Sequence, residues 1–262
     1  MRPIAAGVAL SLATVKAGTF LPFLLLFLRK SDFRTWITLA IAIPALCLAQ
    51  STPLQLPDQL TQELEHIHRS GELGKVNDYS LANPYTADLL GFDSMYYWLG
   101  LGDRGLVRLA EKLTIFLLGC VVALGVLRRD ALPRGAQCSL VGLYAMLFLY
   151  HRAYDLVLLA LPLTYAVGAA LGTSGSAARG WFRSMAIALL LSLYRYGRIT
   201  PIVLRLTAGW TVIGPIVRLL LVPMGVWLLL LAMTFLYLGV RANRRAPSPG
   251  GEGARRLALT PR

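Results

Sequence analysis

Three ionisable side chains stand close together inside a long apolar stretch of the chain: His151, Arg152 and Asp155. The stretch runs from Leu140 to Leu171. A charge held at the centre of a bilayer costs on the order of 3 kcal/mol, so such groups usually pair, face a cavity or bind a ligand. The segment 150–155 (YHRAYD) is therefore the first candidate for chemistry.

On a helix, His151 and Asp155 share a face because they are four residues apart, and Arg152 lies about 100° away. This arrangement suits a phosphate or a proton: Arg152 supplies charge, His151 donates or shuttles a proton, and Asp155 orients His151. Tyr154 belongs to the same candidate binding set. The alternative is an intramembrane ion pair that holds two short helices together.

Two further cations are candidates for the same chemistry. Lys16 lies deep in the first apolar stretch, where it extends to the interface, neutralises a buried acid such as Asp155, or lines the same cavity. Arg195, in the segment 194–198 (YRYGR), falls with Arg205 on the predicted outer face, against the positive-inside rule. This favours an anionic ligand such as a lipid phosphate, although a misplaced span would give the same pattern.

The elements that must position these residues are membrane-spanning helices. The chain has 262 residues, of which 56% are hydrophobic and 15% charged, and its mean hydropathy is +0.60. These values are typical of a polytopic membrane protein. The apolar runs are long and lack period-two alternation, which predicts an all-α helix bundle rather than a barrel.

Seven spans are predicted, at residues 5–28, 33–49, 107–127, 137–150, 153–172, 181–194 and 210–240. A straight span needs roughly 20 residues, so the fourth and sixth are expected to be broken, tilted or re-entrant. Pro215 and Pro223 either kink the last span or leave its start in the interface.

The net charge of +13 indicates an orientation in the membrane rather than a nucleic-acid partner, because the basic residues flank the apolar runs. If the first loop is cytoplasmic, 14 Lys and Arg residues lie inside and 7 outside. We therefore expect an outside start, seven crossings and a cytoplasmic C-terminus, in the plasma (inner) membrane.

The predicted helix bundle covers residues 1–243 and includes one large extracytoplasmic segment, residues 50–106. This segment carries eight acidic residues against three basic ones, and no single carboxylate stands out as a catalytic base. Leucines 56, 60 and 64 recur with Ile67 at helical spacing, which predicts a short amphipathic helix on the membrane surface. Residues 77–91 read as an irregular loop, and residues 244–262 as a disordered cytoplasmic tail.

Several kinds of site are not indicated. His66 and His68 stand two apart and point away from each other on a helix, and the three cysteines lack metal-ligand spacing, so no metal site is expected. No phosphate-cradling glycine loop or nucleophile elbow is convincing. We expect no nucleotide or redox cofactor.

Three groups of residues together resemble one protein family, the polyprenol-phosphate-sugar-dependent glycosyltransferases of family 87. They cover roughly residues 5 to 165, and their order along the chain is more specific than any one of them. The groups are 15–17 (VKA) with 20–23 (FLPF), 29–30 (RK) and Trp36; 76–80 (VNDYS) with 83–84 (NP) and 88–97; and 150–155 leading into 158–162 (LLALP). The family's usual Lys-Pro reads Lys16-Ala17 here.

The resemblance implies a GT-C type fold that transfers a sugar from a polyprenyl-phosphate donor to a glycan or glycolipid acceptor on the outer face. It implies that His151 and Arg152 contact the lipid phosphate while Asp155 orients His151, with Tyr154, Lys16 and Arg195 as further candidates. The family's catalytic acid lies in the first outer loop, and this sequence opens on the family's middle. The catalytic residue is therefore expected upstream of Met1.

Two other functions fit the residues. One is a transporter or flippase for a lipid-linked or anionic solute, with the same cluster as its substrate or proton site. The other is a non-catalytic membrane subunit.

Overall fold

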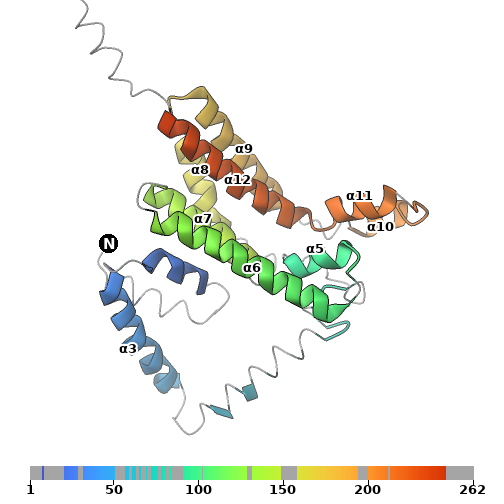
Figure 1. Cartoon of the computed structure of the whole chain (residues 1–262), viewed down its shortest axis with the longest axis horizontal. Coiled ribbons are helices and arrows are strands. Elements are labelled where there is room, and N and C mark those ends of the chain that lie inside the picture. The colour runs from blue at the N-terminus through green and yellow to red at the C-terminus, as the bar shows by residue number, and fades with distance from the viewer. Residues whose placement is uncertain are drawn as a thin grey trace, which may run out of the picture.

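The computed structural model of the chain describes residues 8, 21–28, 32–50, 57–58, 61–62, 65, 69, 72–75, 78–80, 83, 91–101, 103–128, 132–148, 158–193, 200–211 and 213–245. Every regular element in this part of the chain is a helix (Figure 1). The helices are η2 (Leu24–Phe27), α3 (Phe33–Gln50), α5 (Phe92–Trp98), α6 (Arg104–Leu127), α7 (Arg134–Phe148), α8 (Ala160–Gly172), α9 (Ser176–Ser192), α10 (Thr200–Leu206), α11 (Ile213–Leu221) and α12 (Met224–Arg245). The all-α prediction is confirmed for these residues.

Two of the described helices, α6 and α12, are long and apolar enough to cross a membrane. Shorter apolar helices cover Phe33–Leu46 and Ala160–Gly172. The seven predicted spans therefore remain a prediction, and most of the first one, 5–28, lies outside the described residues. The predicted span 210–240 is divided into α11 and α12, with a turn at Val222 and Pro223. Proline has no N–H to continue the helical hydrogen bonds, which accounts for a break at this point.

The main hydrophobic core forms where α12 packs against α9 and α7, and α8 packs against α7 and α9 (Figure 1). Its central side chains are almost fully buried, among them Phe182, Met185 and Leu189 of α9 and Leu229 and Leu236 of α12. Burial of each such side chain contributes about 1.5–3 kcal/mol.

Helix α6 lies beside this core and is barely covered by it. It contacts α7 and η2 through a small second cluster that includes Val122, Val126 and Tyr144. Only 11% of the most apolar 18-residue stretch of this helix is buried inside the described structure. Large apolar side chains on its other faces, such as Phe116 and Leu117, are more than 60% exposed, as expected for a helix that faces lipid.

Hydrogen bonds from three long side chains fix the turns between helices. Arg179 donates two bonds to the Thr173 carbonyl, at 3.2 and 3.0 Å, where α8 turns into α9. Arg218 of α11 donates to the hydroxyl and the carbonyl oxygen of Thr207 after α10, both at 2.7 Å. Trp227 of α12 donates to the Leu219 carbonyl at 3.0 Å. Helix α11 in turn packs on α5, so these turns help to place the short helix α5.

A substitution at Gly239 of α12 tests how closely this helix packs against α9. A Cβ atom at this position would lie 2.8–3.0 Å from three atoms of the buried Phe182 ring. We expect Gly239→Ala to lower the free energy of unfolding by about 1–2 kcal/mol, because overpacking outweighs the better helix propensity of alanine. The measurement is thermal or denaturant unfolding in detergent micelles.

The matched control is Gly180→Ala on the exposed face of α9, where nothing lies within 4 Å of an added Cβ atom. This variant is expected to be as stable as the parent or more stable by about 0.5–1 kcal/mol. Equal effects of the two substitutions would contradict the close contact.

Candidate functional site

The clearest polar site among the described residues lies where α5 and the preceding loop meet the first turns of α6. It is formed by Asp78, Asp93, Arg104 and Arg108, which we call the α5–α6 cluster. All four belong to, or immediately follow, the segment predicted to be extracytoplasmic.

Local sequence explains how α6 presents its two arginines to this cluster. Asp103 caps the helix, its Oδ1 accepting a hydrogen bond of 2.8 Å from the Leu106 amide. Arg104 and Arg108 are four residues apart and so share a face. Val107 between them is fully buried, and the hydroxyls of Tyr96 and Thr114 form a hydrogen bond between α5 and α6.

The Asp78 carboxylate is fully buried and accepts hydrogen bonds from four donors. Its Oδ2 accepts from the Gly74 amide at 2.8 Å and the Ser80 hydroxyl at 2.5 Å. Its Oδ1 accepts from the Ser80 amide at 3.2 Å and from Nη2 of Arg104 at 2.6 Å. Burial raises the pKa of this carboxyl, but the hydrogen bonds and the Arg104 charge outweigh burial and hold the pKa below its ordinary value.

Neighbouring groups hold the same arrangement in place. The Asn83 side-chain amide donates to the Asp78 carbonyl at 2.7 Å. The guanidinium of Arg104 lies 5.7 Å from the centre of the Tyr79 ring, a cation–π distance, and the Tyr79 ring lies 5.8 Å from that of Tyr97. Arg104 is thus held by a carboxylate and an aromatic ring, yet its side chain is 38% exposed to solvent.

Asp93 is a second buried carboxylate, only 7% exposed. Its Oδ1 accepts a hydrogen bond of 2.7 Å from the Ser94 amide. Burial raises its pKa from 3.8 to about 6; the negative charge of Asp78 adds to this rise, whereas Arg108 and the backbone amides oppose it. The charge of Asp93 also acts on Glu111, which lies one turn beyond Val107 on α6.

The two carboxylates differ in what they can do chemically. Asp78 has four donors on two oxygens and no exposed surface, so it serves to position Arg104 and the loop. Asp93 gains or loses its proton close to neutral pH, yet it is nearly closed to solvent. The groups open to an anionic ligand are therefore the two arginines. The described residues contain no group of three or more His, Cys, Asp or Glu side chains that would hold a metal ion.

All six site residues predicted from the sequence lie outside the described residues: Lys16, His151, Arg152, Tyr154, Asp155 and Arg195. Their immediate flank can be placed. Tyr144, late in α7, donates to the Ile115 carbonyl of α6 at 3.1 Å, and Leu140, earlier in α7, lies against Gly125, later in α6. The two helices therefore run antiparallel. Phe148, the last described residue before the segment 150–155, therefore lies at the end of α7 nearer the α5–α6 cluster.

Sequence reasoning did not single out Asp78 or Asp93 among the eight acids of the predicted outer segment. Two local signals were present. Asp78 is followed two residues later by Ser80, the spacing of an Asx-type turn, and Asp93 stands between apolar residues in the sequence GFDSM. The described positions between Pro57 and Arg69 are helical and exposed, while the apolar residues of the predicted amphipathic helix lie outside the described part.

Comparison with known proteins identifies one family. A family model for glycosyltransferase family 87 matches residues 1–149, which include the whole α5–α6 cluster and end directly before the segment 150–155. The resemblance noted from the sequence is thereby confirmed. No curated protein matches the chain, and no solved structure does.

The contribution of the Asp78–Arg104 ion pair can be measured as a change in the free energy of unfolding. We expect Asp78→Asn to lower the free energy of unfolding by about 2 kcal/mol at pH 7, because a charge-assisted bond to Arg104 is lost at a fully buried position. Since the folded-state pKa of Asp78 is depressed, the difference from the parent shrinks as the pH falls below about 4. Glu65→Gln is the control, because the Glu65–Arg69 pair is exposed and contributes less than about 0.5 kcal/mol.

Asp93 should show the opposite pH dependence. Its pKa is raised in the folded state, so the folded protein binds the proton more tightly and loses stability as the pH rises from about 4 to about 6. Asp93→Asn removes this loss and is expected to stabilise the protein by roughly 2–3 kcal/mol at pH 7.5, with no gain at pH 4. Melting temperatures at both pH values test this, with the exposed Asp58→Asn as control; a gain independent of pH would argue against it.

Proposed function

The chain belongs to glycosyltransferase family 87, a family of membrane glycosyltransferases, and from this premise we propose that it transfers a hexose such as mannose. The donor in this proposal is a polyprenyl-phosphate sugar, and the acceptor is an extracytoplasmic glycan or glycolipid. The observation that carries the proposal is the family match over residues 1–149. The two long apolar helices, α6 and α12, support a location in the membrane.

The proposed reaction is an inverting displacement at the anomeric carbon of the sugar. The acceptor hydroxyl oxygen forms a bond to that carbon, the bond from the carbon to the phosphate oxygen breaks, and the lipid phosphate leaves with the electron pair. A carboxylate base takes the hydroxyl proton, and cations stabilise the charge that develops on the phosphate.

Cations at one end of the bundle support a site for the departing phosphate there. Arg104 is fixed by Asp78 and Tyr79 but keeps an exposed part, and Arg108 is exposed one turn later. The end of α7 at Phe148, which leads into the segment 150–155, lies toward the same end. We assign phosphate binding to His151 and Arg152, oriented by Asp155, with Tyr154, Lys16 and Arg195 as further contacts.

The proton acceptor is not assigned to the described carboxylates. Asp78 has its oxygens occupied by four donors, and Asp93 is nearly closed to solvent. Asp78 is therefore better suited to hold Arg104, and neither carboxylate is open to an acceptor sugar. The proposal therefore separates two roles: the α5–α6 cluster positions cations, and another carboxylate acts as the base.

The distribution of arginines supports an orientation for the described helices. The C-terminal ends of α6 and α12 and the N-terminal ends of α7 and α9 meet at one end of the bundle, which we call the basic end. It carries Arg128, Arg134, Arg179, Arg183, Arg241, Arg244 and Arg245. By the positive-inside rule we propose that this end faces the cytoplasm, as part of a multi-pass protein of the plasma membrane. The α5–α6 cluster then lies at the outer side.

The proposal is tested by Arg152→Ala in the protein expressed in its native membrane. Membranes that contain the protein are supplied with a radiolabelled polyprenyl-phosphate hexose and a glycolipid acceptor fraction. We expect the variant to lose at least about 100-fold in transfer at unchanged expression, because one charge-stabilising donor contributes roughly 10²–10³ in rate.

Arg241→Ala, at the basic end, is the matched control and should keep normal transfer. Transfer retained by Arg152→Ala would remove that residue from the site. Movement of the labelled lipid between leaflets, with no transfer in any preparation, would instead support the transporter hypothesis.

A further inference from the structure

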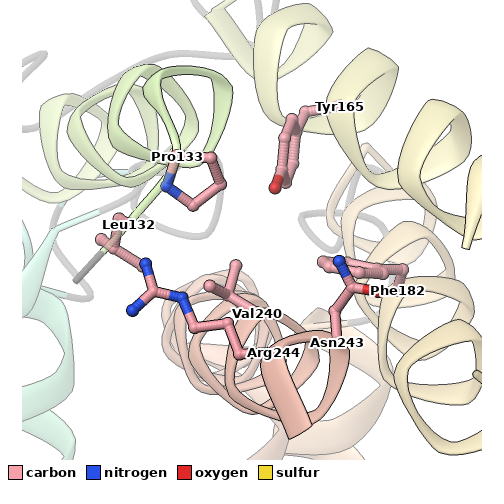
Figure 2. A pocket seen from close by; sticks show the side chains of 7 residues that line it. All are labelled: Leu132, Pro133, Tyr165, Phe182, Val240, Asn243 and Arg244. Carbon is pink, nitrogen blue, oxygen red and sulfur yellow. The ribbon is translucent and has the colours of Figure 1, made fainter. Parts of the chain in front are cut away.

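An open cavity of about 510 Å³ lies at the basic end of the bundle, between α8, α9 and α12 (Figure 2). The Tyr165 hydroxyl points into it from α8, and the side chains of Asn243 and Arg244 flank it from α12. Its walls are apolar and include the buried ring of Phe182 and the side chain of Leu132.

The three polar groups line the same cavity from different sides (Figure 2). Neither the Tyr165 hydroxyl, the Asn243 amide nor the Arg244 guanidinium makes a hydrogen bond or ion pair to another side chain within the described part of the chain. Helices α7, α8, α9 and α12 contain no acidic residue that could neutralise Arg244. A cation, an amide and a hydroxyl around one space form a set of donors for an anion such as a phosphate.

A second space of about 550 Å³ adjoins this cavity and has a different character. It is a groove between α6, α7 and α12, lined mainly by aliphatic side chains, among them Val121 and Leu124 of α6 and Met233 of α12. Its charged lining residue is Arg128, which directly follows the end of α6. Its polar side chains on α12 are Tyr237 and Thr234, and the Thr234 hydroxyl is already bonded to the Leu230 carbonyl at 3.0 Å.

The two spaces lie next to each other along α12. Leu132 lines both of them. Met233 and Tyr237 line the groove, and Val240 and Arg244 line the cavity; these positions follow one another at three- and four-residue steps and so share one face of the helix. From Tyr237 to Arg244 the helix rises about 10 Å. An apolar groove thus lies beside a polar, cationic cavity, and we refer to the two together as the path along α12.

We propose that this path binds one anionic phospholipid, with its phosphate at Tyr165, Asn243 and Arg244 and an acyl chain in the groove between α6 and α12. The choice of occupant follows from charge and rests on the orientation proposed above, in which the basic end faces the cytoplasm. The cytoplasmic leaflet carries a negative surface potential, and basic pockets between membrane helices on that side attract anionic head groups. Both spaces fall within the range of about 300–1,000 Å³ typical of small-molecule sites.

This lipid is distinct from the proposed sugar donor. The α5–α6 cluster lies at the start of α6, whereas Arg128 follows the end of the same helix, so roughly 36 Å of helix separates the two sites. A phosphate at Arg244 therefore does not reach the cations proposed for transfer. The phospholipid would join α6, which the described structure hardly covers, to the packed helices α8, α9 and α12.

The experiment is native mass spectrometry of the delipidated full chain with added phosphatidylglycerol or phosphatidylcholine of identical acyl chains. We expect the parent to retain phosphatidylglycerol roughly tenfold better than phosphatidylcholine. Arg244→Gln is expected to reduce that preference by about three- to tenfold, because the charge-assisted bond to the net negative head group is lost. Tyr165→Phe is expected to lower the retention of both lipids by about three- to tenfold, because both carry the phosphate that its hydroxyl binds. Tyr165→Phe keeps the aromatic contact with Phe182, which lies 5.9 Å away, so folding is preserved.

Two further variants separate the site from general surface charge. Arg134→Gln removes the same charge from the basic end, but this exposed side chain lines neither of the two spaces; it should retain the preference of the parent. Thr234→Phe, which fills the groove, should weaken retention of both lipids.

Equal losses in Arg134→Gln and Arg244→Gln would overturn the proposal, and so would equal retention of the two lipids by the parent. Failure of lipid binding would leave the sugar-transfer assay unaffected, so the two proposals fail independently.

Discussion

The ion pair between Asp78 and Arg104 ties the residues that precede α5 to the first turn of the long apolar helix α6. The carboxylate is fully buried and has four hydrogen-bond donors, so it is satisfied where it lies and holds the arginine in one place. The loop, the short helix α5 and the start of α6 then form one unit. A cation fixed in this way needs little reorganisation when charge develops on a nearby phosphate, which is what electrostatic catalysis requires.

The two ends of the described bundle present different chemistry to their surroundings. At the end with the α5–α6 cluster, arginines are balanced by buried acids and aromatic rings. At the basic end, arginines follow one another without acidic partners on α7, α8, α9 or α12, and an apolar groove lies beside them. One end can therefore carry a reacting phosphate, and the other can hold a structural lipid.

The sequence predicted the helical class and an irregularity of the last helix at Pro223, because both depend on local properties. The helical class follows from long apolar runs, and the helix break follows from the missing N–H of proline. The sequence did not predict which acids are buried. Asp78 becomes structural only because Gly74, Ser80 and Arg104 converge on it, and Arg104 is 26 positions away in the chain. The cavity at Arg244 was missed for the same reason, since its donors come from α8 and α12, which are distant in sequence and adjacent in space. The six site residues chosen from the sequence lie in segments that the structure does not describe.

Helix α6 carries all of its charged residues in its first nine positions, from Arg104 to Lys112. The wholly uncharged remainder, Leu113 to Leu127, is 15 residues long and spans only about 22 Å. The hydrocarbon core of a typical bilayer is about 30 Å thick. If α6 crosses the membrane as proposed, the lipids beside it must shorten, or the stems of Glu111 and Lys112 must extend their charged ends toward the interface. Such a mismatch costs a fraction of a kcal/mol for each ångström, so the thickness of the membrane itself becomes a variable that sets how easily this helix is held.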